Sequence, residues 1–319
     1  MKPSAIVVGL LLLMSGVTGA QQGNDGGNEI RRGAGQASQN KWNAKSPWGQ
    51  TERSGPLSLQ KKAPFKIFDN VYYVGFQTVS SYLVTTSEGL VLIDAGYAQT
   101  ADWLLESIAA LGFRPTDIKY ILVTHSHLDH AGGAAKIQAV SKARVALSAP
   151  DWAEVERQQT SPQQQANFPD PLTRDVILKD GESIAVGDAT FKFHFTPGHT
   201  PGSTSVEFQV RDVGRSYRAL TPGGLGLHYQ ADWGPTFKSS IQRLKDRGPW
   251  DVMLSNHPFL MPRDLEQIEA GLKTRGTGPH PAILGPAAIN GFWDATLKIV
   301  NEKLIAEPPT RPVPAVSSR

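Results

Sequence analysis

A short apolar run at residues 120–123 leads directly into the heptapeptide Thr-His-Ser-His-Leu-Asp-His. The run is aliphatic and ends at polar residues, which predicts a buried strand. Because alternate side chains of an extended segment share a face, His125 and His127 can point at one spot. Asp129 and His130 lie past the strand end and can turn toward a second spot. Imidazole and carboxylate groups suit a borderline ion such as zinc, so this segment predicts two metal centres.

Two histidines farther along the chain are candidates for the remaining ligands. His199 lies in the turn-rich segment Thr-Pro-Gly-His-Thr-Pro-Gly, directly after an alternating run at residues 191–195. His257 lies in Ser-Asn-His-Pro, directly after the apolar residues 252–254. Each follows a predicted strand, where loops carry functional groups on a rigid scaffold. His257 has the alternative of belonging to an ordinary loop.

Three further histidines carry no metal-ligand pattern. His194 alternates with phenylalanines on both sides, so we expect it to face away from them, toward solvent or a helix. His228 and His280 lie among glycines and prolines that could line a pocket, but nothing in their spacing requires this.

The combination of H-x-H-x-D-H, T-P-G-H-T-P-G and a late histidine after a strand resembles the metallo-β-lactamase superfamily, over roughly residues 65–305. Within it the pattern is most similar to subclass B3. The resemblance implies an α/β fold, a four-layer αββα sandwich, and two zinc ions. It assigns the first zinc to three histidines and the second to one aspartate and two histidines: His125, His127 and His199, then Asp129, His130 and His257.

Two more carboxylates and one aromatic residue enter through this resemblance. Asp94 follows a predicted strand at residues 90–93 and would lie beneath the metals, hydrogen-bonding the groups that bind them, although a turn or helix cap is the alternative. Many hydrolases of the superfamily have a metal-bridging aspartate near the position of Asp232. The B3 enzymes instead read Ala-Asp-Ser, with the serine helping to hold substrate. Trp233 replaces that serine here, so substrate anchoring is unassigned, with Trp233 itself as a candidate.

The resemblance implies that hydroxide on two zinc ions opens the β-lactam amide of penicillins, cephalosporins and carbapenems, with Asp129 orienting the hydroxide or moving its proton. One alternative is a lactonase or other ester hydrolase of the same superfamily, with Asp232 bridging the metals. Another is an exported zinc-binding protein without catalysis. The six-ligand set argues against the latter, because structural sites are usually closed by four ligands. One fold hosts many chemistries, so the motif constrains the metals more than the substrate.

Composition narrows the kinds of ligand and partner that this chain can use, and leaves a small-molecule substrate as the expected partner. The chain of 319 residues has no cysteine, whereas the B1 and B2 relatives use a thiolate on the second zinc. The formal net charge is +3, and no basic stripe interleaved with aromatics appears, which disfavours nucleic-acid binding. No second apolar stretch approaches membrane-spanning length, so we expect no membrane anchor. The sequence leaves the oligomeric state open.

The order of segments predicts four regions. A positive start, an apolar core and small residues before a cleavage site indicate a secretory signal, which places the mature protein in the periplasm or medium. A segment rich in Gly, Asn, Gln and Ser follows, and the chain ends in a proline-rich tail; both are expected to be disordered. The regions are residues 1–20 (signal peptide), 21–60 (flexible arm), 61–307 (metallo-hydrolase domain) and 308–319 (tail).

Periodicity predicts helices and strands that alternate through the domain. A polar segment rich in glutamine is expected to form a loop over the mouth of the site, or simply solvated surface. The expected elements that the structure tests most directly are helices at 101–111, 237–244 and 292–305, the polar loop at 151–173, a hairpin joining 176–178 to 183–186, and a long loop at 276–290.

Overall fold

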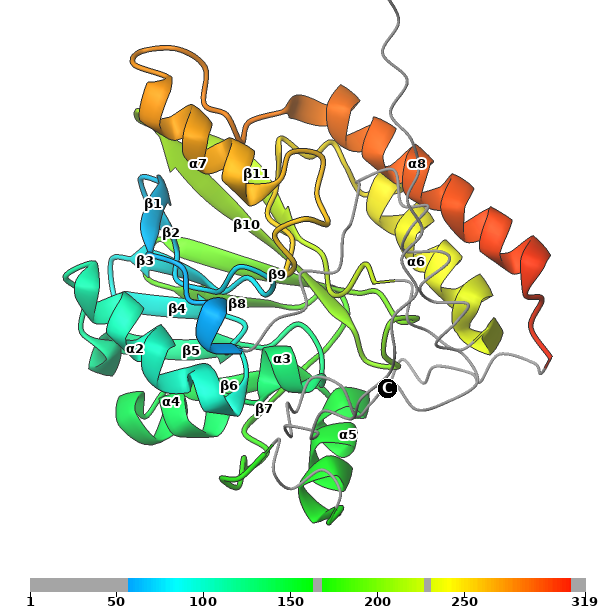
Figure 1. The fold of residues 1–319 in the computed structure, drawn as a ribbon, viewed down its shortest axis with the longest axis horizontal. Coiled ribbons are helices and arrows are strands. Elements are labelled where there is room, and N and C mark those ends of the chain that lie inside the picture. The colour runs from blue at the N-terminus through cyan, green and yellow to red at the C-terminus, as the bar shows by residue number, and fades with distance from the viewer. Residues whose placement is uncertain (1–56, 163–167, 227–230, 311–319) are drawn as a thin grey trace, which may run out of the picture.

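The computed structural model describes residues 57–162, 168–226 and 231–310. These residues form two β-sheets packed face to face, with helices covering both outer surfaces (Figure 1). This four-layer αββα sandwich confirms the predicted fold class. The signal peptide expected at residues 1–20, and most of the expected arm and tail, lie outside the described residues.

The first sheet has seven strands in sequential order. β1 to β4 are antiparallel, and β4 to β7 are parallel, so helices connect the later strands. Because β4 and β5 are parallel neighbours, the residues after them meet at one edge of the sheet. The strands are β1 Phe65–Phe68, β2 Val71–Tyr73, β3 Tyr82–Thr86, β4 Gly89–Ile93, β5 Ile118–Leu122, β6 Arg144–Ser148 and β7 Val176–Leu178.

The second sheet has five strands in the order β12-β11-β10-β9-β8, and only the β11–β12 pair is parallel. β9 ends just before the T-P-G-H-T-P-G segment, and β12 ends just before the segment that carries His257. The strands are β8 Ser183–Val186, β9 Ala189–Phe195, β10 Thr204–Asp212, β11 Arg215–Thr221 and β12 Val252–Met253.

The helices form the two outer layers (Figure 1). α2, α4 and α5 lie against the first sheet, whereas α6 and α8 pack side by side over the second sheet and α7 contacts β1. The helices are α2 Ala101–Ala110, α3 Leu128–Ala131, α4 Ala134–Ser141, α5 Ala149–Thr160, α6 Gly234–Asp246, α7 Leu265–Thr274 and α8 Gly285–Ala306, with short 3-10 helices at η2 Leu57–Leu59, η3 Ala98–Thr100, η4 Pro115–Asp117 and η6 Ala231–Trp233.

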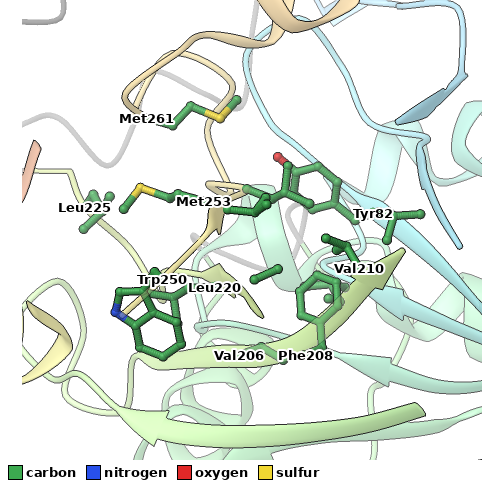
Figure 2. Packing of buried hydrophobic residues seen from close by; sticks show 14 of the residues in the cluster. Tyr82, Val206, Phe208, Val210, Leu220, Leu225, Trp250, Met253 and Met261 are labelled. Atoms are coloured by element: carbon green, nitrogen blue, oxygen red, sulfur yellow. The ribbon is translucent and has the colours of Figure 1, made fainter. Parts of the chain in front are cut away.

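Apolar residues pack on both faces of the first sheet. Val91 and Ile93 of β4 face the second sheet, whereas Leu90 and Leu92 of the same strand face the helices. Figure 2 shows part of the inter-sheet layer, where Tyr82 of the first sheet meets Phe208 of the second. Continuous apolar strands are typical of sheets covered on both faces. The ends of the strands are therefore held rigidly, which fixes the loops that follow them.

The expected loop at residues 151–173 is wrong in its first half, because α5 spans Ala149–Thr160. Pro150 and Asp151 form a favourable first turn, and Trp152 and Val155 bury one face against the first sheet. The many glutamines suggested a loop, but Gln158 and Gln159 lie near the end of this helix, and Gln158 is buried. Residues 163–165 lie outside the described residues.

Two other expectations fail at element boundaries. Residues 176–178 and 183–186 do not form a hairpin, because β7 pairs with β6 in the first sheet whereas β8 pairs with β9 in the second. The turn between them thus carries the chain from one sheet to the other. The expected loop at 276–290 ends earlier, since α8 begins at Gly285 with Pro286 in its first turn.

The last residues of the expected flexible arm pack on the domain. Leu57–Leu59 form a 3-10 helix, and the backbone N–H of Gln77 donates to the carbonyl of Gln60 at 2.9 Å. Within the described ranges, no helix has the length and apolar character needed to cross a membrane.

Candidate metal centre

The six predicted ligands lie together at one edge of the sandwich, in two clusters of three. His125, His127 and His199 form the first cluster; Asp129, His130 and His257 form the second. Within each cluster the potential ligand atoms lie within 4.8 Å of one another. The structure therefore brings together all six side chains in the grouping that the sequence predicted.

The first cluster presents a buried nitrogen without a partner. His125 is 0% exposed, and its Nε2 has no hydrogen-bond partner. Its Nδ1 lies 3.0 Å from the Thr124 hydroxyl, which itself donates to Asp94, so Nδ1 donates and Nε2 keeps its lone pair. Burial, together with the neighbouring histidines, holds the pKa of His125 well below its usual range. His125 is therefore a neutral imidazole with its free lone pair facing the other rings of the cluster.

His199 has the same arrangement. Its Nδ1 lies 2.9 Å from the carbonyl oxygen of Gly226, which can only accept, so Nδ1 carries the proton and Nε2 keeps the lone pair that a metal would use. The rings of His127 and His199 are in edge contact, with centroids 4.7 Å apart. Burial lowers the pKa of His127, although the nearby carboxylate of Asp129 acts in the opposite direction.

The second cluster pairs a carboxylate with two imidazoles. Nε2 of His130 lies 3.2 Å from Oδ2 of Asp129 and 3.4 Å from Nε2 of His257. Nδ1 of His257 donates to the Thr78 carbonyl at 2.8 Å. Burial alone would lower the pKa of His130, but the carboxylates of Asp129 and Asp94 outweigh it and raise the pKa.

Asp94 lies beneath both clusters and joins them. Its carboxylate accepts from the Thr124 backbone N–H (2.7 Å) and hydroxyl (2.9 Å) and from Nδ1 of His130 (2.8 Å). Asp94 has a positive φ of 60°, which aspartate tolerates better than most residues. The Thr124 hydroxyl also accepts from the Asn256 amide at 3.1 Å. This buried network fixes the ring orientation of His125 and His130. No motif in the sequence pointed to Asn256.

The donor set fits zinc. Nitrogen ligands at 2.0–2.1 Å from a tetrahedral zinc are about 3.4 Å apart, and the Nε2 atoms of His130 and His257 are separated by 3.4 Å. In His125, His130, His199 and His257 an acceptor lies beside Nδ1, so Nε2 is the nitrogen offered to the cluster, which is the usual arrangement for metal-binding histidines. The unpartnered Nε2 of His125 is otherwise costly in a buried position, and a metal ion would satisfy it.

Neither cluster includes Asp232. The Asp232 carboxylate accepts from the Thr310 backbone N–H at 2.7 Å, and Trp233 packs against the core at the start of α6. In the described part of the chain, no further carboxylate joins either cluster. After β11 the chain passes through Pro222 to Gly223 and Gly224, and a Cβ on Gly224 would lie 2.5 Å from the His199 ring. Close packing on His199 therefore requires glycine at this position.

The other histidines are placed away from the clusters. His194 is 3% exposed and hydrogen-bonds to Glu207 and Arg247, and Arg247 follows α6 directly. Of the two expected environments, solvent or a helix, it therefore has the helix. His280 is buried, stacks on Phe68 and contacts the carbonyl of Ile67, which is a structural role. His228 lies outside the described residues.

Sequence reasoning missed Asp151, which the structure places beside the first cluster. Its carboxylate accepts from the Ser126 and Gly202 backbone N–H groups and from the Thr200 hydroxyl. The helix-start pattern Ser-Ala-Pro-Asp could have revealed α5, but no sequence pattern indicates which loops this carboxylate contacts.

We expect the stability of the metal-free protein to depend on pH through Asp151. Burial raises its pKa from 3.8 to about 6, despite the hydrogen bonds that it accepts. Between these values the folded protein binds more protons than the unfolded chain, so the free energy of unfolding falls as pH rises. Asp151→Asn cannot titrate, so its stability relative to wild type should rise by roughly 3 kcal/mol from about pH 4 to pH 7. Urea unfolding of both proteins measures this difference, and a constant difference would refute the expectation.

An αββα sandwich with two such ligand clusters at its edge is the architecture of a metal-dependent hydrolase. A sequence model of the Metallo-beta-lactamase superfamily matches residues 74–216. BJP-1, a subclass B3 metallo-beta-lactamase of Bradyrhizobium japonicum, is similar in structure with a TM-score of 0.70 and 28% identity, over 78% of this chain and 96% of that one. The Rm3 metallo-beta-lactamase is 31% identical with a TM-score of 0.67, over 78% and 96%. The chain belongs to the metallo-β-lactamase superfamily.

Sequence relatives within the superfamily differ in function. A hydroxyacylglutathione hydrolase of Anaeromyxobacter dehalogenans is 31% identical over 131 residues, which are 41% of this chain and 42% of that protein. The matches to the first curated relatives span only about half of their length. The superfamily is metal-dependent, typically with zinc, and the two clusters are suited to such ions.

Proposed function

We propose that this chain is a dizinc β-lactamase of the B3 type that hydrolyses penicillins, cephalosporins and carbapenems. The observation that carries the proposal is the ligand set: three histidines in one cluster and Asp-His-His in the other, with no additional carboxylate in reach among the described residues. The resemblance to B3 enzymes, which lack both a thiolate and a bridging aspartate, predicts this set. The similarity to a subclass B3 structure and to the Rm3 metallo-beta-lactamase, over nearly the whole length of each, supports it.

Each cluster would hold one zinc ion through its three side chains. Bound zinc supplies a Lewis acid and a water molecule with a pKa near 7. Asp94 holds His130 in the tautomer that presents Nε2, and Thr124 does the same for His125. The side chain of Asp129 keeps 18% exposure beside His130 and His257, so besides holding zinc it is placed to accept a hydrogen bond from a reacting water and orient it.

The second candidate is a thioester, ester or lactone hydrolase of the same superfamily. The similarity to a hydroxyacylglutathione hydrolase favours it. This alternative would use Asp232 to bridge the metals, which disagrees with the hydrogen bond from Thr310 and with the absence of Asp232 from both clusters. We therefore rank β-lactam hydrolysis first.

Purified zinc-loaded protein should hydrolyse at least one β-lactam, and a chelator should abolish the turnover. Asp232→Ala should retain most of the activity, because neither cluster includes Asp232. A lactone and a glutathione thioester serve as competing substrates. If they turn over and β-lactams do not, and Asp232→Ala is inactive, the second candidate replaces the first.

We also propose that the protein is exported. The proposal is supported by the positive start, apolar core and small-residue cleavage site within residues 1–20. The mass of the protein recovered from the periplasm or medium tests it, since removal of the signal would leave Gln21 as the first residue. A protein that retains residues 1–20 and stays in the cytoplasm would contradict export.

A further inference from the structure

A buried carboxylate that belongs to neither cluster holds together the two loops that supply the first one. Asp151 is 1% exposed and lies in the first turn of α5. Its Oδ2 accepts from the Ser126 backbone N–H at 3.0 Å, and Ser126 lies between His125 and His127. The same oxygen accepts from the hydroxyl of Thr200, next to His199, at 2.9 Å.

The other oxygen of the carboxylate extends this contact along the loop that carries His199. Oδ1 of Asp151 accepts from the Gly202 backbone N–H at 3.1 Å, and the Ser148 hydroxyl donates to the Gly202 carbonyl at 2.7 Å. Both polar groups of Gly202 are therefore bound to the start of α5. The Thr200 hydroxyl also contacts the hydroxyl of Ser203 at 2.7 Å, which closes the turn on itself.

Packing around Gly202 leaves no space for adjustment. A Cβ at this position would lie 2.1 Å from the Ser148 hydroxyl oxygen and 2.8 Å from Cγ of Asp151. Such distances do not occur for real Cβ atoms, so the second glycine of T-P-G-H-T-P-G is required for the loop to seat against the carboxylate. The T-P-G-H-T-P-G loop therefore packs directly against Asp151, with no room for a side chain between them.

Burial of the Asp151 carboxylate at this position is energetically unfavourable. The groups that donate to Asp151 in the described part of the chain are all uncharged, and burial of an ionised group disfavours folding. Two backbone N–H groups, one hydroxyl and the start of a helix offset part of this cost. A group that reduces stability is retained most readily where it serves function.

We infer that Asp151 is a positioning residue for the first metal site, acting through Ser126 and the Thr200 to Gly202 turn. It sets the spacing between the loop with His125 and His127 and the loop with His199. The inference rests on the proposed binding of zinc by this cluster, but not on the identity of the substrate.

Asp151→Asn tests the inference with minimal change of shape. If the amide oxygen takes the position of Oδ2, the amide nitrogen faces the N–H of Gly202, and two donors then oppose each other. The Gly202 contact is lost, while the shape of α5 is kept. We expect zinc affinity at the first site to fall roughly 10- to 100-fold, the range typical for residues that hold a metal ligand in place. Affinity at the second site should be unchanged.

Competition of the protein with a chromophoric chelator measures both zinc affinities. His199→Ala and His257→Ala identify which binding step belongs to which site. Asp102→Asn is the matched control, because Asp102 also lies in the first turn of a helix but is exposed and paired with Lys136. Thr200→Val removes one of the three hydrogen bonds and serves if Asp151→Asn does not fold; it should weaken the first site less.

The outcomes separate this inference from the proposed function. A wild-type protein that binds no zinc would overturn both. Zinc binding in wild type with equal first-site affinity in Asp151→Asn would overturn only the positioning role, as would equal weakening of both sites. Selective loss of zinc affinity at the first site would establish the positioning role, even if no β-lactam is hydrolysed. The metal-free Asp151→Asn protein should then be no less stable than metal-free wild type at neutral pH.

Discussion

Replacing His125 by alanine is expected to abolish hydrolysis and to reduce zinc binding from two ions to one. The side chain is completely buried, and its Nε2 is the one cluster nitrogen shown to lack any partner within the protein. No neighbouring group can take its place without moving a strand end. The loss of activity should therefore exceed the roughly 10- to 100-fold typical for residues that only orient a ligand.

Metal analysis and turnover of the His125→Ala protein measure this effect. The control is His194→Gln, because His194 is also buried but contacts Glu207 and Arg247 and belongs to neither cluster. That variant can lose thermal stability, yet it should keep two zinc ions and wild-type activity. Normal zinc content in His125→Ala would contradict the assignment of the first site.

Asp94→Asn is expected to damage the second site and the fold together. Asparagine tolerates the left-handed backbone that Asp94 adopts, so the substitution changes charge and acceptor number with little backbone strain. The amide offers one acceptor oxygen where the carboxylate serves Thr124 twice and His130 once. We expect a 10- to 100-fold loss of activity and a loss of about 1–3 kcal/mol for a buried group left unsatisfied.

Two measurements distinguish these effects. Urea unfolding of the metal-free protein reports the stability loss, and zinc competition reports the affinity at the second site. Asp117→Asn is a suitable control, since this exposed aspartate pairs with Arg114 far from the clusters. If Asp94→Asn matches wild type in zinc affinity, Asp94 does not orient His130.

The sequence predicted the fold class and the six clustered side chains because each ligand directly follows a strand. Strand ends are fixed by an apolar pattern, as in residues 120–123, and a local motif then fixes which residues come next. Asp94 was predicted only through the family resemblance. Its left-handed backbone conformation and its three hydrogen bonds depend on contacts with residues about 30 positions away.

What the sequence could not predict depends on contacts between distant segments. Asp151 lies in a stretch whose glutamines suggested a loop, and its partners Ser126 and Gly202 are 25 and 51 residues away. The strands at 176–178 and 183–186 looked like a hairpin because turn residues separate them, and only pairing partners decide that they belong to different sheets. Asp232 was considered from its local motif, but its carboxylate accepts a hydrogen bond from Thr310, 78 residues farther along the chain.

The origin of the ligands has a consequence for the molecule as a whole. His125 and His127 follow β5 of the first sheet, whereas His199 follows β9 of the second. The second cluster repeats this division, with Asp129 and His130 from the first sheet and His257 after β12. Each bound zinc ion would therefore connect the two sheets at the edge of the sandwich that carries the clusters. The free energy of zinc binding would add to the free energy of unfolding by holding the sheets together. Loss of zinc would therefore lower the stability of the fold as well as the activity.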